Sequence, residues 1–293
     1  MKAAFLSNRG VVKVIGDDTR NFLNNLLTTE MADVKPGVAK FGALLTPQGK
    51  ITADFLITEA PSGHGGGFLI DCAGSLARPL ATKLSFYKLR AKVTVDNLSD
   101  NLGVVAVWDG APSLIPDLAY RDPRHDQLGW RILLPADLAD KLAASLGAEA
   151  TTAAAYEAHR IACGVPQGGV DFAYGDAFPH ETNMDRLHGV DFDKGCYVGQ
   201  EVVSRMQHRG TARTRTVRLI VDGFGPEPGI DVIAGDRAIG KMGSSADGRG
   251  LATLRIDKVD DAIKASRPLT AGGVAVRLVD EDDIKLAPKT DGI

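Results

Sequence analysis

Cysteine is scarce in this chain of 293 residues, and its three cysteines, Cys72, Cys163 and Cys196, lie far apart. They form no Cys-x-x-Cys pair and no disulfide framework, which favours a reducing compartment. Three scattered thiols also cannot complete a zinc or iron–sulfur site by themselves. A metal centre at any one of them would therefore need further ligands from a partner.

Long apolar runs are missing too, since none approaches the roughly 18 residues that cross a bilayer. The N-terminal stretch MKAAFLSNRG returns to polar residues after a short apolar patch, which is too little for a secretory signal peptide. No excess of positive charge exists either, because the formal net charge is -3 and the pI is about 6.1. We therefore expect a cytoplasmic protein of bacterial type, with no nucleic-acid partner and no membrane partner.

What the sequence does contain is a mixture of helical and strand-like patterns, which favours the α+β class. The length predicts two or three domains of about 100 to 200 residues each. Apolar patterns predict strands at 11–16, at 68–73 and at 93–98, a helix that Asp17 or Asp18 caps, and a hairpin over 39–60. Further helices are expected at 75–92, where Pro79 is tolerable only near the first turn, and at 135–148 and 153–163. Residues 161–192 are rich in turns, and short strands after 211, with one helix near 258–264, predict a small β-barrel.

The stretch DKGCYVGQEVVSRMQ, residues 193–207, carries the most specific chemistry of the chain. If residues 198–207 are helical, Cys196 lies at or just before the helix N-terminus, where backbone amides and the helix dipole stabilise a thiolate. Lys194 would add a full positive charge, and Gly195 would let the backbone turn or approach a ligand closely. A buried cysteine that packs as a small hydrophobe is the open alternative for Cys196, and it is the expected role of Cys72 and Cys163.

No acidic residue occurs between Val202 and Val221, a stretch that holds one histidine, His208, and several arginines. Guanidinium groups suit carboxylate or phosphate ligands, so an anion could dock here. A solvated helix end and strand edge would account for the same charges. The arginines are Arg205, Arg209, Arg213, Arg215 and Arg218.

The segment KGCYVGQE, residues 194–201, resembles the signature of YgfZ-type folate-binding proteins, which include the mitochondrial iron–sulfur assembly relatives. The preceding FPHETNMDRLHGVDFD is similar to the segment that these proteins place before the signature. LLTPQGKITADFLI resembles their early hairpin, and RAIGKMGSSADGRGLATLRI their C-terminal barrel. The resemblance thus covers nearly the entire chain.

This superfamily also contains the glycine-cleavage T-protein, an aminomethyltransferase that uses tetrahydrofolate. The resemblance implies a T-protein-like core over 1–210, in which two intertwined α+β subdomains surround a folate cavity. They would comprise roughly 1–40 with 150–210, and 41–149. A C-terminal β-barrel would follow at 211–293.

The resemblance also assigns residues to the folate cavity. Asp54 falls where the T-protein carries an Asp-Asp-Leu segment, but Ala53 replaces the neighbouring acid, and Ala162 and Cys163 stand where the T-protein has a folate-contacting glutamate. A structural loop network is the alternative role for Asn183, Asp185 and Arg186. The candidates for folate contact are Asp54, Asn183, Asp185, Arg186, Tyr197, Gly199, Gln200 and Glu201.

Three functions follow from these observations. The first is a folate-binding accessory factor that assembles or repairs iron–sulfur clusters through Cys196, which Lys194 tunes. It would use tetrahydrofolate or a derivative. The sequence does not choose among three roles for the Cys196 thiolate: an iron ligand, a ligand of a transient cluster shared with an A-type carrier that serves client iron–sulfur enzymes, or a group that performs redox or one-carbon chemistry. The alternative is a tetrahydrofolate-dependent aminomethyl or one-carbon transferase, which the missing acids disfavour. A folate-sensing adaptor in which Cys196 only packs is the third, and whether any reaction is catalysed stays open.

Overall fold

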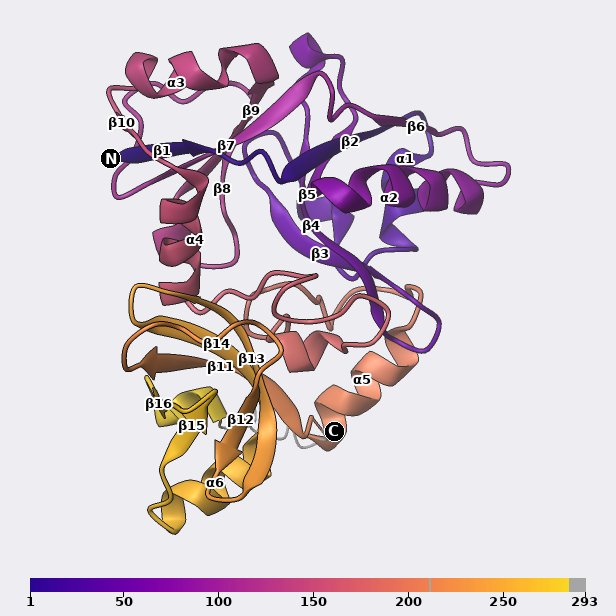
Figure 1. Cartoon of the computed structure of the whole chain (residues 1–293). Coiled ribbons are helices and arrows are strands. Elements are labelled where there is room, and N and C mark those ends of the chain that lie inside the picture. The colour runs from indigo at the N-terminus through magenta and orange to yellow at the C-terminus, as the bar shows by residue number, and fades with distance from the viewer. Residues whose placement is uncertain (211, 285–293) are drawn as a thin grey trace. The chain divides into compact units, whose positions relative to one another are not determined.

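The computed structural model describes residues 1–210 and 212–284 (Figure 1). The chain forms two compact units, each assembled from separate stretches of sequence. The first unit contains Met1–Leu45, Thr52–Tyr156 and Leu187–Val198. The second contains Thr46–Ile51, Glu157–Arg186 and the chain from Gly199 onward.

One five-stranded sheet of the first unit has the order β3-β4-β5-β2-β6. Strand β2 pairs antiparallel with both β5 and β6, and β5 pairs antiparallel with β4. These strands confirm the predicted early strand, hairpin and following strands. Their bounds are β2 (Arg9–Ile15), β3 (Lys40–Leu45), β4 (Ile51–Glu59), β5 (Phe68–Ala73) and β6 (Thr94–Asn97).

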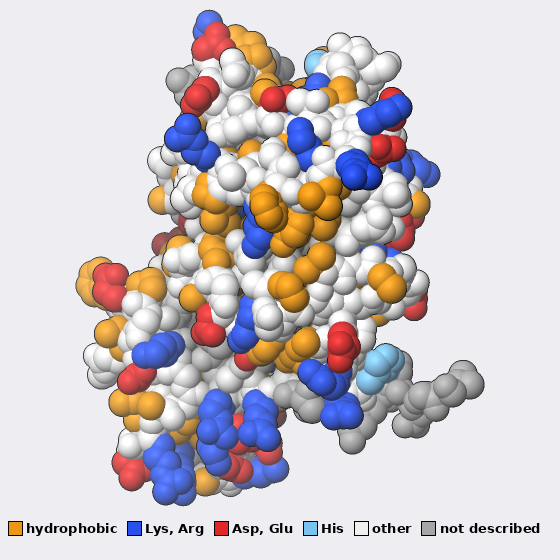
Figure 2. Space-filling model, turned by 90° about the vertical axis from the view of Figure 1, so that its right-hand side faces the viewer, with side chains coloured by type: hydrophobic (Ala, Val, Ile, Leu, Met, Phe, Trp, Pro, Cys, Tyr) orange, Lys and Arg blue, Asp and Glu red, His pale blue; other side chains and the backbone are white. Residues whose placement is uncertain are grey.

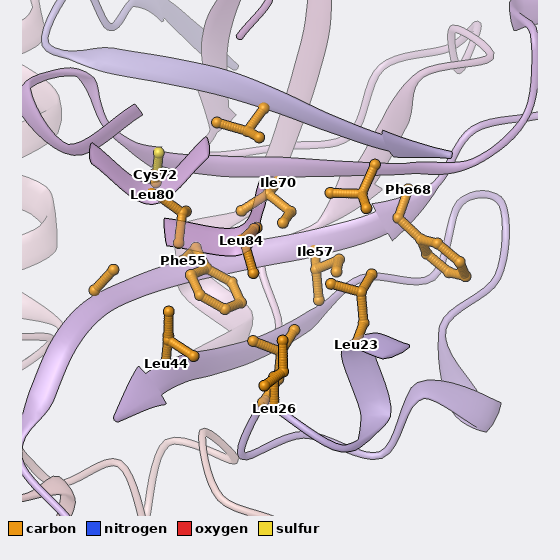
Figure 3. Packing of buried hydrophobic residues seen from close by; sticks show 14 of the residues in the cluster. Leu23, Leu26, Leu44, Phe55, Ile57, Phe68, Ile70, Cys72, Leu80 and Leu84 are labelled. Atoms are coloured by element: carbon orange, nitrogen blue, oxygen red, sulfur yellow. The ribbon is translucent and has the colours of Figure 1, made fainter. Parts of the chain in front are cut away.

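Helices α1 (Thr19–Asn24) and α2 (Gly74–Tyr87) pack with this sheet around one apolar core. Figure 3 shows Leu80 and Leu84 of α2 directed toward Phe55 and Ile70 of the sheet. Burial of such side chains is the main stabilising contribution to this unit, at about 1.5 to 3 kcal/mol each. The prediction that Pro79 lies near the first turn is wrong, because it is the sixth residue of α2. The carbonyl that loses its donor belongs to Ser75, which is exposed, so water can bond to it.

The other five-stranded sheet of the first unit has the order β10-β1-β7-β9-β8. Its strands are antiparallel except for the short parallel pair of β1 with β10. Helix α3 (Ala139–Ser145) contributes to its core. The strands are β1 (Lys2–Phe5), β7 (Leu102–Trp108), β8 (Ala119–Arg121), β9 (Trp130–Pro135) and β10 (Glu149–Ala150).

The second unit contains a closed barrel of order β11-β14-β13-β12-β15-β16, which confirms the predicted C-terminal barrel. Its interior is apolar, and helix α6 (Ile256–Lys264) adds Val259 and Ala262 to the same core. The strands are β11 (Thr214–Val221), β12 (Asp231–Ala234), β13 (Arg237–Ala246), β14 (Arg249–Arg255), β15 (Leu269–Ala271) and β16 (Val274–Leu278).

Two further helices, α4 (Ala153–Ala162) and α5 (Gln200–Arg209), flank the turn-rich stretch. Between them the structure has only the short 3₁₀ helix Pro179–Thr182, as the glycines and prolines predict. The remaining 3₁₀ turns are Met31–Asp33, Ser62–His64, Asp126–Leu128, Ala136–Leu138 and Glu281–Ile284.

The α+β class with a C-terminal barrel is therefore confirmed. The expected subdomain boundaries stay a prediction; the sheet that contains β1 and β10 also takes β7, β8 and β9 from the 41–149 range. No helix in residues 1–210 and 212–284 is long and apolar enough to cross a bilayer.

Candidate functional site

Cys196 is exposed, whereas Cys72 and Cys163 are buried. The packing role expected for Cys72 and Cys163 is thus confirmed, and the packing alternative for Cys196 is wrong. The expected helix begins later than predicted, at Gln200, after Gly199 in the left-handed conformation. Cys196 therefore precedes the first helical residue by four positions, and the dipole effect is confined to the first turn. What characterises this thiol is its exposure on an irregular segment, 195–197.

Lys194 anchors that segment to the first unit. Its Nζ lies 2.9 Å from the carbonyl oxygen of Asn24, 2.8 Å from that of Leu27 and 2.7 Å from that of Thr29. An ammonium group has three N–H donors, so these carbonyls occupy all of them. The residue is only 7% exposed, and burial lowers the pKa of Lys194 to about 8. At neutral pH the side chain is therefore mainly charged and holds the segment in place. An electrostatic effect of Lys194 on Cys196 stays a prediction.

Further hydrogen bonds hold the chain on both sides of Lys194. The Asp191 amide donates to the Thr28 carbonyl at 2.8 Å, and the Asp191 carboxylate accepts from the amides of Asp193 and Lys194, each at 3.0 Å. On the other side, Tyr197 is buried, and its ring centre lies 5.4 Å from the Lys194 ammonium. The exposed thiol thus lies close in sequence to two buried residues, Lys194 and Tyr197, which limits the loss of chain entropy when it binds a ligand.

Gly195 and Gly199 differ in whether the structure requires a glycine at their position. Gly199 has a φ of +84°, and a Cβ there would lie 2.5 Å from the carbonyl oxygen of Thr46, so both backbone conformation and space demand glycine. Gly195 has no such φ, and a Cβ there would meet nothing within 4 Å. The open space beside Gly195 and the exposed Cys196 leaves room for another molecule to approach the backbone closely.

Three of the folate candidates lie in a structural network of the second unit. Arg215 donates to both carboxylate oxygens of Asp185, at 3.0 and 2.7 Å, and to Asn183 Oδ1 at 3.2 Å. Asn183 Nδ2 also donates to the Thr216 carbonyl at 2.7 Å, and Arg186 donates to the Asp283 carbonyl at 3.2 Å. These contacts tie the turn-rich stretch to the barrel, which favours the structural role for these side chains. Asn183 and Asp185 therefore offer little capacity for a pterin.

Part of the arginine-rich stretch also forms ion pairs within the second unit. Arg215 is buried against Asp185, and Arg218 donates to both oxygens of Asp283, at 3.0 and 2.9 Å. Two of the five arginines thus have carboxylate partners within the same unit, which weakens the expectation of an anion site. The other folate candidates of this unit, Gln200 and Glu201, form the first turn of α5.

Asp54 lies in β4 of the first unit and is 7% exposed. Burial opposes the charge of Arg124, but the Asp122 carboxylate, which accepts from Arg124 at 2.9 and 2.6 Å, raises the pKa of Arg124, with a smaller contribution from the charge of Asp54. Asp54 thus belongs to a region of buried charge. The other members include Arg9, Asp71, Tyr120, Arg131 and Tyr156.

Sequence reasoning missed this buried network. In it, Asp71 accepts from Arg9 Nε at 2.6 Å and from the Tyr120 hydroxyl at 3.1 Å, and Arg131 donates to the Tyr156 hydroxyl at 2.8 Å. The available signal was a single charge inside an apolar strand, Asp71 in FLIDCA and Arg131 in WRILLP. Such buried charges need partners, so the strands that carry them must meet.

The network should make acid unfolding depend on Asp122. Burial opposes its charge, but Arg124 and Arg131 outweigh burial and lower the Asp122 pKa to about 2 from its usual 3.8. Because the folded-state pKa is depressed, Asp122 contributes about 2 kcal/mol of stability above pH 4, and the contribution disappears as the pH falls toward 2. We expect urea unfolding between pH 6 and pH 2 to show a flatter pH dependence for Asp122→Asn than for the native chain. The exposed control Asp137→Asn should keep the native dependence, and an unchanged slope in Asp122→Asn would contradict the assignment.

The described part of the chain has a fold similar to that of the glycine-cleavage T-protein. Its structure superposes on the glycine cleavage system aminomethyltransferase T from Bartonella henselae with a TM-score of 0.72, covering 95% of this chain and 85% of that chain. The sequence identity is 16%, so this likeness describes the fold alone. Residues 213–285 match the family model of the CAF17 C-terminal beta-barrel domain.

Proteins similar in sequence identify the family to which the chain belongs. The chain is 31% identical to the iron-sulfur cluster assembly factor IBA57 homolog, mitochondrial, of Pyricularia oryzae, over 98% of this chain and 78% of that protein. It is 32% identical to the human mitochondrial IBA57 protein, over 87% of this chain and 77% of the relative. The match to the Mycosarcoma maydis homolog is 36% identical over 74% of this chain and spans 57% of that relative's length. The chain belongs to the IBA57 family of iron–sulfur cluster assembly factors.

Proposed function

We propose that this chain supports the assembly or repair of iron–sulfur clusters in client enzymes, with the Cys196 thiolate as a direct ligand of iron. The observation that carries the proposal is an exposed cysteine on a segment that Lys194 anchors, in a chain from this family. Binding requires loss of the thiol proton and donation of a sulfur electron pair to iron. No electron transfer is involved.

A single thiolate leaves most positions of a cluster without a ligand, because clusters are typically held by four cysteines. The remaining ligands must come from a second protein. We propose that this protein is an A-type iron–sulfur carrier and that the cluster is shared only transiently before it reaches client enzymes. The narrower YgfZ-type assignment belongs to the same proposal, since KGCYVGQE resembles the signature of those proteins.

Folate binding is the second part of the proposal, with tetrahydrofolate or a derivative as the ligand. The T-protein-like fold and Asp54 favour it, whereas Asn183 and Asp185 are engaged with Arg215. The remaining candidates are Tyr197, Gly199, Gln200 and Glu201. Calorimetric titration with tetrahydrofolate tests this part: a saturable heat supports it, and no binding at millimolar ligand would remove it without affecting the role of Cys196.

A folate-dependent aminomethyl or one-carbon transferase is the competing function. It needs an acid to activate the folate or the donor, and Ala53, Ala162 and Cys163 stand where the T-protein has acidic groups. The retained acid, Asp54, is the one observation in its favour. Turnover of an aminomethyl donor with tetrahydrofolate by the purified chain would revive it.

Loss of the protein from its host cells tests the main proposal. We expect the activity of iron–sulfur enzymes to fall while enzymes without clusters keep theirs, and the native chain to restore the lost activity. Unchanged iron–sulfur enzyme activity would contradict the proposal. The relatives are described as mitochondrial, whereas we expect the cytoplasm for this chain. Cell fractionation decides between these compartments.

Gly195→Ala should show whether another protein approaches the thiol closely, without disturbing the folding of this chain. A Cβ at this position meets nothing within 4 Å, so we expect the free energy of unfolding to change by less than about 1 kcal/mol. If a cluster-bearing partner approaches this backbone closely, the same methyl group should slow cluster transfer measured by visible absorption. Gly199→Ala, which is strained, is the contrasting variant and should destabilise the chain. Native transfer rates in Gly195→Ala would show that no molecule packs against this glycine.

A further inference from the structure

A groove of about 530 Å³ lies on the first unit between the residues around α1 and the C-terminal end of α2. Its apolar lining consists of Phe22, Leu26, Tyr87, Leu89 and Ala91. Phe22 and Leu26 are largely buried, at 8% exposure each, so they form the floor. Leu89 is 87% exposed and the neighbouring Phe86 is 77% exposed, which adds apolar surface at the rim.

Leu89 lies in a turn that two hydrogen bonds hold in place. The amide of Ala91 donates to the carbonyl of Lys88 at 2.7 Å, and the amide of Lys92 donates to Asp18 Oδ2 at 2.7 Å. Leu89 itself has a φ of +44°, a conformation in which a bulky side chain is an outlier. Folding gains nothing from a leucine in this position, because the side chain is both strained and exposed. The residue is therefore better explained by contact with another molecule.

The rim of the groove is mainly basic. Lys88 and Arg90 line the groove together with one acid, Asp18, and Lys83 and Lys92 lie close to them in a stretch of sequence that contains no acidic residue. Of the acids near the groove, Asp18 accepts from the Lys92 amide and Asp17 lies 3.7 Å from the Lys92 ammonium. Figure 2 faces the side of the first unit that carries α1 and α2 and shows hydrophobic side chains gathered there with Lys and Arg side chains around them. Such a surface is complementary to an apolar side chain that acidic residues flank.

The groove and the segment that carries Cys196 are linked through α1 and the residues that follow it. Lys194 donates to the Asn24 carbonyl at 2.9 Å and to Asn24 Oδ1 at 3.3 Å, and the next residue, Asn25, lines the groove. Tyr87 and Val198 both pack on the apolar core to which α1 contributes Phe22 and Leu23. All of these residues belong to the first unit, so one partner could cover the groove and reach the thiol.

We infer that this groove is the docking surface for the protein that shares its cluster with Cys196, and that this carrier inserts an apolar side chain flanked by acidic residues beside Leu89. The inference rests on the proposed function. Docking here gives the carrier a contact that does not depend on the cluster, and the basic rim speeds its approach.

Leu89→Asn tests the inference, because asparagine tolerates a positive φ and removes the apolar contact. We expect an unchanged or slightly raised midpoint of thermal unfolding and a rise of about tenfold or more in the Kd for a purified A-type carrier, measured by calorimetry without a cluster. Arg90→Glu should raise the Kd as well and weaken its dependence on salt. Leu114→Asn, at another leucine of the first unit that is 77% exposed, is the matched control and should bind like the native chain.

The outcomes separate this inference from the proposed function. If Leu89→Asn and Arg90→Glu bind the carrier like the native chain while Cys196→Ala loses the shared cluster, the groove inference is wrong and the proposed function stands. If the native chain binds the carrier only when a cluster is present, the groove inference alone is wrong, and if it binds the carrier neither with nor without a cluster, both the inference and the proposed sharing with a carrier are wrong. If the native chain dimerises in light scattering and Leu89→Asn does not, the occupant is a second copy of this chain, which also overturns the inference.

Discussion

Cells that carry Cys196→Ala in place of the native chain should lose iron–sulfur enzyme activity down to the level of cells without the protein. The reason is that the exposed thiol is the proposed ligand of iron, and alanine cannot replace it. Because the side chain is exposed and packs in no core, the free energy of unfolding should change by less than about 0.5 kcal/mol. Enzyme activity in extracts and urea unfolding of the purified variant measure the two effects.

Cys163→Ala is the matched control, since it removes a thiol that is buried. It should cost about 1 kcal/mol of stability through lost packing and leave iron–sulfur enzyme activity in place at equal expression. Full rescue by Cys196→Ala would contradict the account and leave the folate part of the proposal as the remaining function.

Lys194→Met should combine loss of function with loss of stability. The substitution leaves the carbonyl oxygens of Asn24, Leu27 and Thr29 without the donor that now lies within 2.9 Å of each. At about 1 kcal/mol for each lost partner, the free energy of unfolding should fall by about 3 kcal/mol. The segment that holds Cys196 loses its anchor, so cluster binding should weaken even at temperatures where the variant stays folded.

Lys258→Met is the control for Lys194→Met. Lys258 is 38% exposed and forms only surface ion pairs, which contribute at most about 1 kcal/mol. Chemical denaturation and hydrogen exchange of residues 189–198 measure the two variants. If Lys194→Met keeps native stability and native protection of this segment, the ammonium is not the anchor that its contacts indicate.

The α+β class and the barrel could be predicted because local patterns determine them. Alternation in TVRLIV and the glycine-rich turns that follow indicate short strands, and the barrel buries those apolar faces. The start of α5 was predicted too early because the pattern VGQEVV carries no signal that Gly199 must adopt a positive φ. The second reason for glycine at this position, the close approach of the Thr46 carbonyl, comes from a residue far away in the sequence.

The residues of the candidate site could be named from the sequence, but their contacts could not. Cys196 and Lys194 were found because KGCYVGQE is distinctive, but the acceptors of Lys194 lie 165 to 170 positions earlier in the chain. Likewise, nothing local pairs Asp185 with Arg215, although their ion pair decides that Asp185 has a structural contact. Tertiary partners of this kind follow from the fold and cannot be read from spacing.

The most direct test of the central claim is the rate at which Cys196 is alkylated when a cluster is present. The chain is mixed anaerobically with a cluster-loaded A-type carrier, treated with iodoacetamide, and the modified peptide is quantified by mass spectrometry. If the Cys196 sulfur is bound to iron, alkylation should be strongly slowed in the complex and should recover when a chelator removes the iron. Apo-carrier should protect much less, which separates ligation from simple coverage. Equal alkylation with and without the cluster, in a complex that still absorbs as an iron–sulfur species, would contradict the account.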